Sequence, residues 1–519
     1  MSLLRNFAAV GSGTASSRIL GFIRDIFIAA ALGTGPVAEA YFVAQRLPNL
    51  FRRLFAEGAF ASAFVPLFTK THGSDGMEAA RKFAEESLAA LAAALLAFTI
   101  VAELAMAWLT LALAPGFAVD PAKLDLTVLF SRIAFPYLFL ISLVTLLSGA
   151  LNGLGRFVAA AFSQTLLNAF LIAALVFVYF SGEIGTERAG ILLTASVIVG
   201  GVFQLAFLFY ACHRAGISLK PRWPRWTPGV KRLTALAGPS IIAGGIVQIN
   251  IVVGTIVASL QPGAVSWLYY ADRLYQLPLG IVGIAVGIVL LPDLARALRS
   301  GRDADASHAQ NRSIEFAAAL TLPASVALLV IPGPILHVLF EHGAFSAADT
   351  AATAPALAAY AIGLPAFVAI KVLQPAYFAR EDTRTPMLYG AVSMVVNVVG
   401  AFALFFLFGT VGIAAATTLA AWANTFLLAR TLARNGHLAS DAVLKRRLPL
   451  LTLASVVMGV GLYGANLLLT PWLTASHLLV EVGALAVLVL FGFLLFLLVA
   501  QVSGAMDLRR IVMSVLRRT

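Results

Sequence analysis

Long apolar segments joined by short polar turns make up almost the entire chain. A helix needs about 20 mainly apolar residues to cross the hydrocarbon core of a bilayer, and fourteen segments reach that length. They are residues 6–32, 38–68, 84–114, 126–153, 158–181, 189–212, 233–260, 264–295, 314–340, 350–378, 386–408, 411–433, 449–470 and 477–501. The pattern predicts an all-α polytopic membrane protein with about fourteen transmembrane helices.

The composition excludes a water-soluble enzyme. The 519 residues are 60% hydrophobic and 12% charged, with a mean hydropathy of +0.92, whereas a soluble domain is about half apolar and a quarter charged. The first apolar run is interrupted by Arg18, Arg24 and Asp25, so we interpret it as a permanent helix and not as a cleavable signal. The single cysteine, Cys212, excludes an intramolecular disulfide framework.

The distribution of basic residues predicts the orientation in the membrane. If the N-terminus is cytoplasmic, 26 of the 36 Lys and Arg residues lie in cytoplasmic loops and tails, and only Lys123 and Arg188 lie on the other side. This asymmetry is typical of an even number of spans with both termini in the cytoplasm. We interpret basic runs such as 220–226 and 445–447 as orientation signals that attract anionic membrane lipid, and no nucleic-acid partner is expected.

The other eight basic residues fall inside predicted spans, and five of them lie in the first two. The eight are Arg18, Arg24, Arg46, Arg52, Arg53, Arg132, Arg273 and Lys371. An arginine at the centre of a membrane helix costs roughly 2.5–3.5 kcal/mol, so it persists where it faces a wet interior and a negative partner. The intramembrane acids, mainly Asp25, Glu57, Glu103, Asp272 and Asp293, are fewer. This surplus predicts a basic cavity for an anionic cargo.

Helix packing is the alternative role for these arginines. On the second segment Asn49, Arg52, Arg53 and Glu57 share one broad helical face, and Arg53 can pair with Glu57 across one turn. Pro48 predicts a kink just before them. We favour the packing role for Arg46 and Arg53, and an anion site for the three residues Arg24, Arg52 and Arg273.

The chain also resembles itself. Residues 40–51 align with 267–278 at an offset near 227, and residues 136–141 align with 365–370 at an offset of 229. These matches predict an N-terminal six-helix bundle over 1–220 and a C-terminal six-helix bundle over 228–435, related as parallel repeats around a central cavity. An extra helix pair follows at 445–505, and a basic cytoplasmic tail at 506–519.

Motifs for bond-making chemistry are missing from the sequence. It contains no Gly-Lys pair, so it has no P-loop, and it contains no H-E-x-x-H motif or Cys-His cluster. No spacing resembles a hydrolytic triad. These observations predict a transporter that is not an enzyme and that needs no cofactor or metal.

Several motifs together resemble the bacterial lipid II flippase family known as MurJ or MviN. They are SRILGFIRD at 17–25, EAYFVAQRLPNLFRRLFAEGAFASAFVPLF at 39–68, SWLYYADRL at 266–274 and AREDTRTP at 379–386. That family is part of the multidrug/oligosaccharidyl-lipid/polysaccharide exporter superfamily. The resemblance implies that the substrate is lipid II, an undecaprenyl-pyrophosphate disaccharide-pentapeptide, and that it is flipped from the cytoplasmic to the periplasmic leaflet by alternating access for cell-wall synthesis.

The resemblance also implies roles for particular residues. Those expected to bind the pyrophosphate are Arg18, Arg24, Arg52 and Arg273. Those expected to support the cavity are Asp25, Glu39, Asn49, Arg53, Glu57, Ser266 and Asp272. Two positions depart from the family pattern, because Glu39 stands where Asp is common and Gln276 stands where some members have Glu. The extra helix pair resembles the family's groove for the polyprenyl tail.

Other functions stay open on the sequence. A cation-coupled drug exporter of the same superfamily would favour carboxylates in its cavity, and the excess here is basic. A flippase for another prenyl-pyrophosphate-linked oligosaccharide needs the same arginines, and a non-transporting scaffold needs an added cytoplasmic domain. The expected location is the bacterial inner membrane, with cell-wall synthesis and division proteins as candidate partners. We hypothesise that the membrane potential or an exchanged ion drives the cycle.

Overall fold

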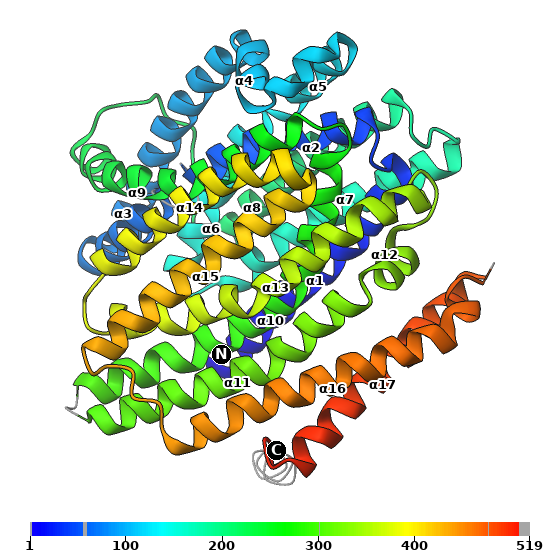
Figure 1. The fold of residues 1–519 in the computed structure, drawn as a ribbon. Coiled ribbons are helices and arrows are strands. Elements are labelled where there is room, and N and C mark those ends of the chain that lie inside the picture. Colours follow the sequence, from blue (N-terminus) through cyan, green and yellow to red (C-terminus); the bar gives the residue numbers. More distant parts are fainter. Residues whose placement is uncertain (1–2, 55–59, 300–301, 476, 508–519) are drawn as a thin grey trace. The chain divides into compact units, whose positions relative to one another are not determined.

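Every regular element in the part of the chain that the structure describes is a helix (Figure 1). This computed structural model describes residues 3–54, 60–299, 302–475 and 477–507. Its helices are α1 (Leu3–Leu32), α2 (Pro36–Phe51), α3 (Ala61–Leu104), α4 (Met106–Leu113), the 3₁₀ helix η2 (Pro115–Val119), α5 (Pro121–Ala134), α6 (Tyr137–Gly153), α7 (Phe157–Ser181), α8 (Glu187–Arg214), α9 (Pro228–Ser259), α10 (Ala264–Arg299), α11 (Asp303–Val330), α12 (Pro332–Phe340), α13 (Ala347–Phe378), α14 (Arg384–Phe408), α15 (Thr410–Arg434), α16 (Ala442–Leu473) and α17 (Leu478–Val502). The predicted all-α fold is confirmed.

Ten helical segments among the described residues are long and apolar enough to cross a membrane, so the chain is a multi-pass membrane protein. They correspond to ten of the predicted spans. The other four, 6–32, 38–68, 233–260 and 264–295, coincide with α1, with α2 and the start of α3, with α9, and with α10. Three of these four carry the predicted binding arginines, which lower their hydropathy. The total of fourteen spans stays a prediction.

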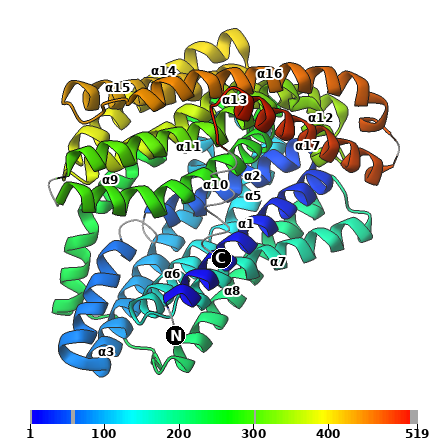
Figure 2. The same cartoon turned by 90° about the horizontal axis from the view of Figure 1, so that it is seen from below.

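The helix α3 is a hairpin of two helices. At Gly76 the backbone has a φ of 82° and a ψ of −179°, a conformation that a residue with a side chain rarely adopts. The rings of Phe64 and Phe83 stack with their centroids 5.6 Å apart, whereas a straight helix would separate them by about 28 Å. The chain therefore doubles back within α3 (Figure 2), at the break expected between the spans ending at 68 and beginning at 84.

The described chain forms two compact units, residues 1–266 with 342–346, and residues 267–341 with 347–519. The helix α9 belongs to the first unit because it packs against α3 and α4. The starting residues of α4 and α12 are 106 and 332, those of α5 and α13 are 121 and 347, and those of α7 and α14 are 157 and 384. This regular interval fits the internal repeat, whose predicted domain boundaries stay a prediction.

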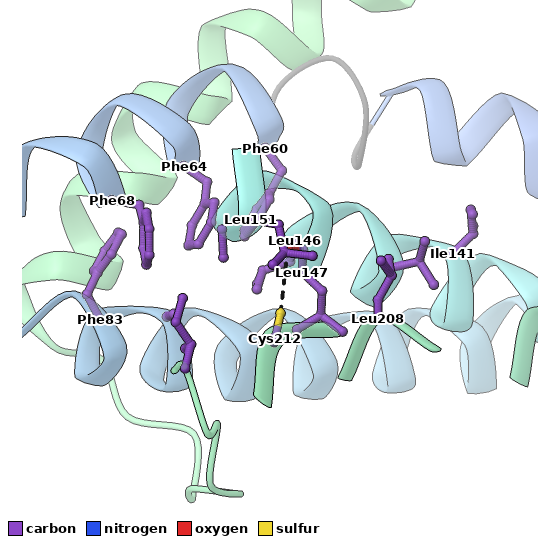
Figure 3. Close-up of a cluster of buried hydrophobic side chains, with 14 of the residues drawn as sticks. Phe60, Phe64, Phe68, Phe83, Ile141, Leu146, Leu147, Leu151, Leu208 and Cys212 are labelled. Atoms are coloured by element: carbon purple, nitrogen blue, oxygen red, sulfur yellow. Dashed lines mark hydrogen bonds between the residues drawn. The ribbon is translucent and has the colours of Figure 1, made fainter. Parts of the chain in front are cut away.

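A cluster of aromatic and aliphatic side chains holds α3, α6 and α8 together in the first unit (Figure 3). Phe60, which precedes α3, stacks on Phe64, and Phe64 stacks on Phe68 one turn further along the helix, with ring centroids 5.5 and 5.6 Å apart. They meet leucines of α6, and Cys212 of α8 is fully buried among them, with its Sγ 3.9 Å from the carbonyl oxygen of Leu147. Close packing of this kind makes the hairpin and the two helices one rigid body.

Residues 342–346, between α12 and α13, dock on the end of α1. The N–H of Ala344 donates to the carbonyl oxygen of Ala30 at 2.8 Å. Two glycines allow this approach, because a Cβ on Gly33 would lie 2.4 Å from the Ala344 oxygen and one on Gly343 would lie 2.2 Å from the Ala30 oxygen. The short segment therefore belongs to the first unit, although α12 and α13 belong to the second.

In the second unit, the extra helix pair α16 and α17 packs on α11 and α12 through an apolar cluster. Charged side chains fix one end of the pair. Arg312 of α11 donates to both carboxylate oxygens of Asp441, at 2.9 and 2.7 Å, and Glu315 accepts from Arg312 and Arg447. Asp441 also caps α16 by accepting the N–H of Leu444 at 2.6 Å.

Candidate functional site

Arg24 of α1, one of the predicted binding arginines, is held by two neighbouring side chains. Its Nε and Nη2 donate to Oδ1 of Asp25 at 3.1 and 2.7 Å, and its Nη1 donates to Oδ1 of Asn168 at 2.9 Å. Asp25 is 3% exposed, whereas the Arg24 side chain is 20% exposed. The carboxylate is therefore shielded from water and fixes a guanidinium that stays partly accessible.

Asn168 of α7 is a site residue that we did not predict. Its Nδ2 donates to the carbonyl oxygen of Ser17 at 3.0 Å, while its Oδ1 accepts from Arg24. The amide thus joins two turns of α1 to α7 and orients the guanidinium. One sequence signal pointed to this residue, since it aligns with Asn397 in the internal repeat. Arg18, another predicted binding residue of α1, is exposed.

The second predicted arginine cluster begins where α2 ends. Residues 52–54 form a wider π-type turn after α2, which contains Pro48, and such turns are frequent at functional sites. Arg52 is half-buried and Arg53 is exposed. Asn49 turns back on its own helix, donating from Nδ2 to the carbonyl oxygen of Gln45 at 2.8 Å. Glu57, the expected partner of Arg53, lies outside the described residues.

Arg46 makes a contact that fits the packing role. Its Nη1 donates to the hydroxyl of Thr255 on α9. A hydrogen bond of this type joins α2 to α9 and satisfies part of a half-buried guanidinium. This contact is consistent with a packing role for Arg46, and that role stays a prediction.

Glu39 lies in a buried polar cluster with Lys123. Its side chain is 2% exposed and Lys123 is 7% exposed; Oε2 accepts from the Lys123 ammonium, and Oε1 accepts from the N–H of Val265 at 3.3 Å. The carboxylate thus joins α2, α5 and the start of α10. Nearby, the hydroxyl of Ser266 is fully buried and makes no hydrogen bond to any residue that the structure describes.

Asp272 and Arg273 lie on α10, in the second unit. The guanidinium carbon of Arg273 is 4.5 Å from the centroid of the Tyr269 ring, close enough for a cation–π interaction. Gln276, which stands where some family members have Glu, donates from Nε2 to Asp272. An amide at this position can therefore hold the neighbouring carboxylate, which a second carboxylate could not do when ionised.

The structure thus brings Arg24, Asp25 and Asn168 together, and separately Glu39 with Lys123 and Asp272 with Gln276. Arg24 and Arg52 belong to the first unit and Arg273 to the second. In the described residues, no three His, Cys, Asp or Glu side chains lie close enough to hold a metal ion. A shared anion site of Arg18, Arg24, Arg52 and Arg273 stays a prediction.

Comparison with known proteins shows which protein family the chain resembles. The family model described as lipid II flippase MurJ matches residues 28–483. A "Probable lipid II flippase MurJ" of Rhizobium meliloti (strain 1021) is 49% identical over 519 residues, covering 100% of this chain and 97% of that protein. A "Lipid II flippase MurJ" of Burkholderia cenocepacia is 35% identical over 445 residues, covering 84% of this chain and 85% of that protein.

Solved structures share the fold. A lipid II flippase MurJ in an inward closed conformation superposes with a TM-score of 0.77 at 24% identity, covering 95% of this chain and 98% of that one. An inward-facing multidrug resistance MATE family transporter gives a TM-score of 0.68 at 15% identity, covering 83% of this chain and 95% of that one. The chain therefore shares its arrangement of helices with these two proteins.

Proposed function

The chain belongs to the lipid II flippase MurJ family, and we propose that it moves lipid II from the cytoplasmic to the periplasmic leaflet of the bacterial inner membrane by alternating access. The observation that carries this proposal is the 49% identity to a MurJ relative along all 519 residues. No bond is made or broken in such a transfer, so the protein is a transporter and not an enzyme.

The pyrophosphate of the substrate is the group that the arginines would bind. A guanidinium is planar, stays charged and can engage phosphate oxygens through two parallel hydrogen bonds. Asp25 and Asn168 orient Arg24 for such a contact in advance, which lowers the entropy lost on binding. Arg18 and Arg52 in the first unit and Arg273 in the second would complete the site in the conformation that binds the headgroup.

The prenyl tail is proposed to stay in lipid along the extra helix pair. The helices α16 and α17 border an apolar groove of about 260 Å³, lined by Leu469, Trp472, Val480, Ala484 and Val487. Its lining offers isoprenoid units a hydrocarbon surface without a charged group. Both termini are proposed to be cytoplasmic because the basic residues gather on that side of the predicted spans.

A translocation assay in cells that depend on this chain tests the proposed function. The chain is expressed as the only lipid II flippase, and periplasmic lipid II is measured before and after the chain is depleted. Depletion is expected to trap lipid II in the cytoplasmic leaflet and to cause lysis. Two results would refute the proposal: loss of a surface polysaccharide with normal lipid II export, and accumulation of cationic drugs alone.

A further inference from the structure

The connection between α8 and α9, which we propose to be cytoplasmic, exposes two tryptophans to which the proposed function assigns no role. The sequence KPRWPRW at 220–226 contains Trp223, which is 86% exposed, and Trp226, which is 64% exposed. Tryptophan is usually well buried in proteins. In membrane proteins it is enriched at the boundary between lipid and water, where an apolar ring meets a wet edge.

The connection is bonded to α3 at both ends, so Trp223 and Trp226 lie in a fixed position on the first unit. Before them, Ile217 is fully buried in the α3–α6–α8 cluster. The buried carboxylate of Glu85 then accepts the N–H of Lys220 at 3.0 Å and the Nε of Arg222. After them, the hydroxyl of Thr227 donates to Glu86 at 2.9 Å.

Prolines keep the segment extended between these fixed points. Pro221 and Pro224 have a fixed φ and no N–H to satisfy, and each disfavours a helical conformation in the residue before it. Pro228 follows as the first residue of α9, whose N-cap is Thr227. The exposure of the two indole rings is therefore a consequence of the local sequence and of the two fixed ends.

The fixed ends also set the depth of the segment. Glu85 and Glu86 are the last charged residues before the uncharged run 87–102 of α3, which belongs to a helix long and apolar enough to cross the membrane. A segment bonded to these two carboxylates lies where the headgroups of the bilayer begin.

We propose that residues 220–226 form an interfacial anchor that binds anionic phospholipid headgroups. The rings of Trp223 and Trp226 enter the boundary between headgroups and acyl chains, and the side chains of Lys220 and Arg225, both exposed, contact lipid phosphate. Arg222 shares its charge with Glu85. A lipid partner fits the position of the segment at the bilayer surface and its basic charge. The anchor is a function in addition to lipid II transport and does not depend on the proposed lipid II site.

Quenching of tryptophan fluorescence tests the anchor. The full chain and a Trp223→Phe/Trp226→Phe variant are placed in nanodiscs that contain phosphatidylcholine and phosphatidylglycerol, one of which carries bromine near the headgroup. The difference between the two proteins is the emission of Trp223 and Trp226, while the other four tryptophans stay unchanged. Brominated phosphatidylglycerol is expected to quench this emission more strongly than brominated phosphatidylcholine at the same mole fraction.

Two single variants test whether the positive charge of this segment sets the preference for anionic lipid. Arg225→Gln is expected to lower the preference for the anionic lipid about fivefold, the effect of one basic residue near an anionic surface. Arg188→Gln is the matched control, because Arg188 is 75% exposed in the first turn of α8, at the opposite end of that helix, and it is expected to change nothing.

Three outcomes would overturn the anchor. Emission that neither lipid quenches would mean that the rings face water or another protein. Equal quenching by both lipids would exclude anionic recognition, and so would an unchanged preference in Arg225→Gln. Because none of these measurements uses lipid II, a failure of the anchor leaves the proposed flippase function untouched.

Discussion

At the scale of single residues, the fixed orientation of Arg24 is the feature that would favour a diphosphate in the proposed site. Asp25 lies against the guanidinium, so the pair together is close to neutral. A diphosphate would then gain from two hydrogen bonds in a fixed geometry, which a flexible ammonium cannot offer. In the proposed site the exposed Arg18 would supply additional positive charge.

We predict that Arg24→Ala, Arg52→Ala and Arg273→Ala each abolish lipid II translocation while protein levels stay normal. Arg24→Lys is the sharper variant, because it keeps the charge and removes the planar fork, and we expect it to fail as well. Complementation of flippase-depleted cells and immunoblotting measure the two quantities. If all three alanine variants sustain cell-wall synthesis, the site assignment is wrong.

The buried pair of Glu39 and Lys123 gives a prediction for stability. Lys123→Ala leaves the Glu39 carboxylate, 2% exposed, without its cation, and breaking a buried pair from one side costs about 3–5 kcal/mol. Heating in the presence of a thiol-reactive dye measures unfolding, because Cys212 is the only cysteine and is buried. The double variant Glu39→Gln/Lys123→Met is the control and should recover most of the loss. A single variant as stable as the parent would refute the pair's role.

At the scale of elements, the contact of residues 342–346 with α1 depends on glycine. Gly343→Ala would place a Cβ 2.2 Å from the Ala30 oxygen, in addition to the strain of a φ of +60°. Gly182→Ala is the matched control, because its φ is +73° and nothing lies within 4 Å. The control should lose only the roughly 1–2 kcal/mol of left-handed strain, whereas Gly343→Ala should lose more in the same dye assay. Equal losses would mean that the segment is not held in place by this contact.

The cap of α16 gives a prediction for pH. The Leu444 N–H and the Arg312 guanidinium hold the pKa of Asp441 below its usual range. A lowered pKa in the folded state means that the contribution to stability is present above the unfolded value of about 3.9 and is lost as the pH falls through the folded value. Distances between spin labels on α11 and α16 should therefore broaden as the pH falls below about 4.

Asp441→Asn separates the cap from the charge. Asparagine caps a helix about as well as aspartate, but it does not titrate. The variant should dock α16 at neutral pH and show a smaller change on acidification, while Glu315 still accepts from Arg312 and Arg447. An unchanged acid response would mean that Asp441 does not contribute to it.

At the scale of the whole molecule, the proposed cycle moves negative charge outward. A diphosphate carries roughly two negative charges, and each charge that crosses about 100 mV changes the free energy by about 2.3 kcal/mol. The inside-negative potential of a bacterium favours this direction. An ionophore that collapses the potential should therefore slow lipid II translocation in intact cells. Unchanged flipping after collapse would count against a role of the potential.

The sequence by itself determined the helical membrane fold, the ends of most helices to within a few residues, and the family. Hydrophobic length, prolines, glycines and motif residues act locally, and a local pattern is readable without a structure. The arginines on α1, α2 and α10 stood out for the same reason, because charge inside an apolar run is costly wherever it occurs.

Only the tertiary structure decided which side chains these charges meet. Asn168 binds Arg24 across 144 positions of sequence, and Lys123 binds Glu39 across 84. On the sequence, Lys123 read as a loop charge on the outer side of the membrane, yet it is buried because α2 packs on α5. Such partners depend on how distant helices pack, and helix packing is set by the shapes of whole faces and not by any local spacing of residues.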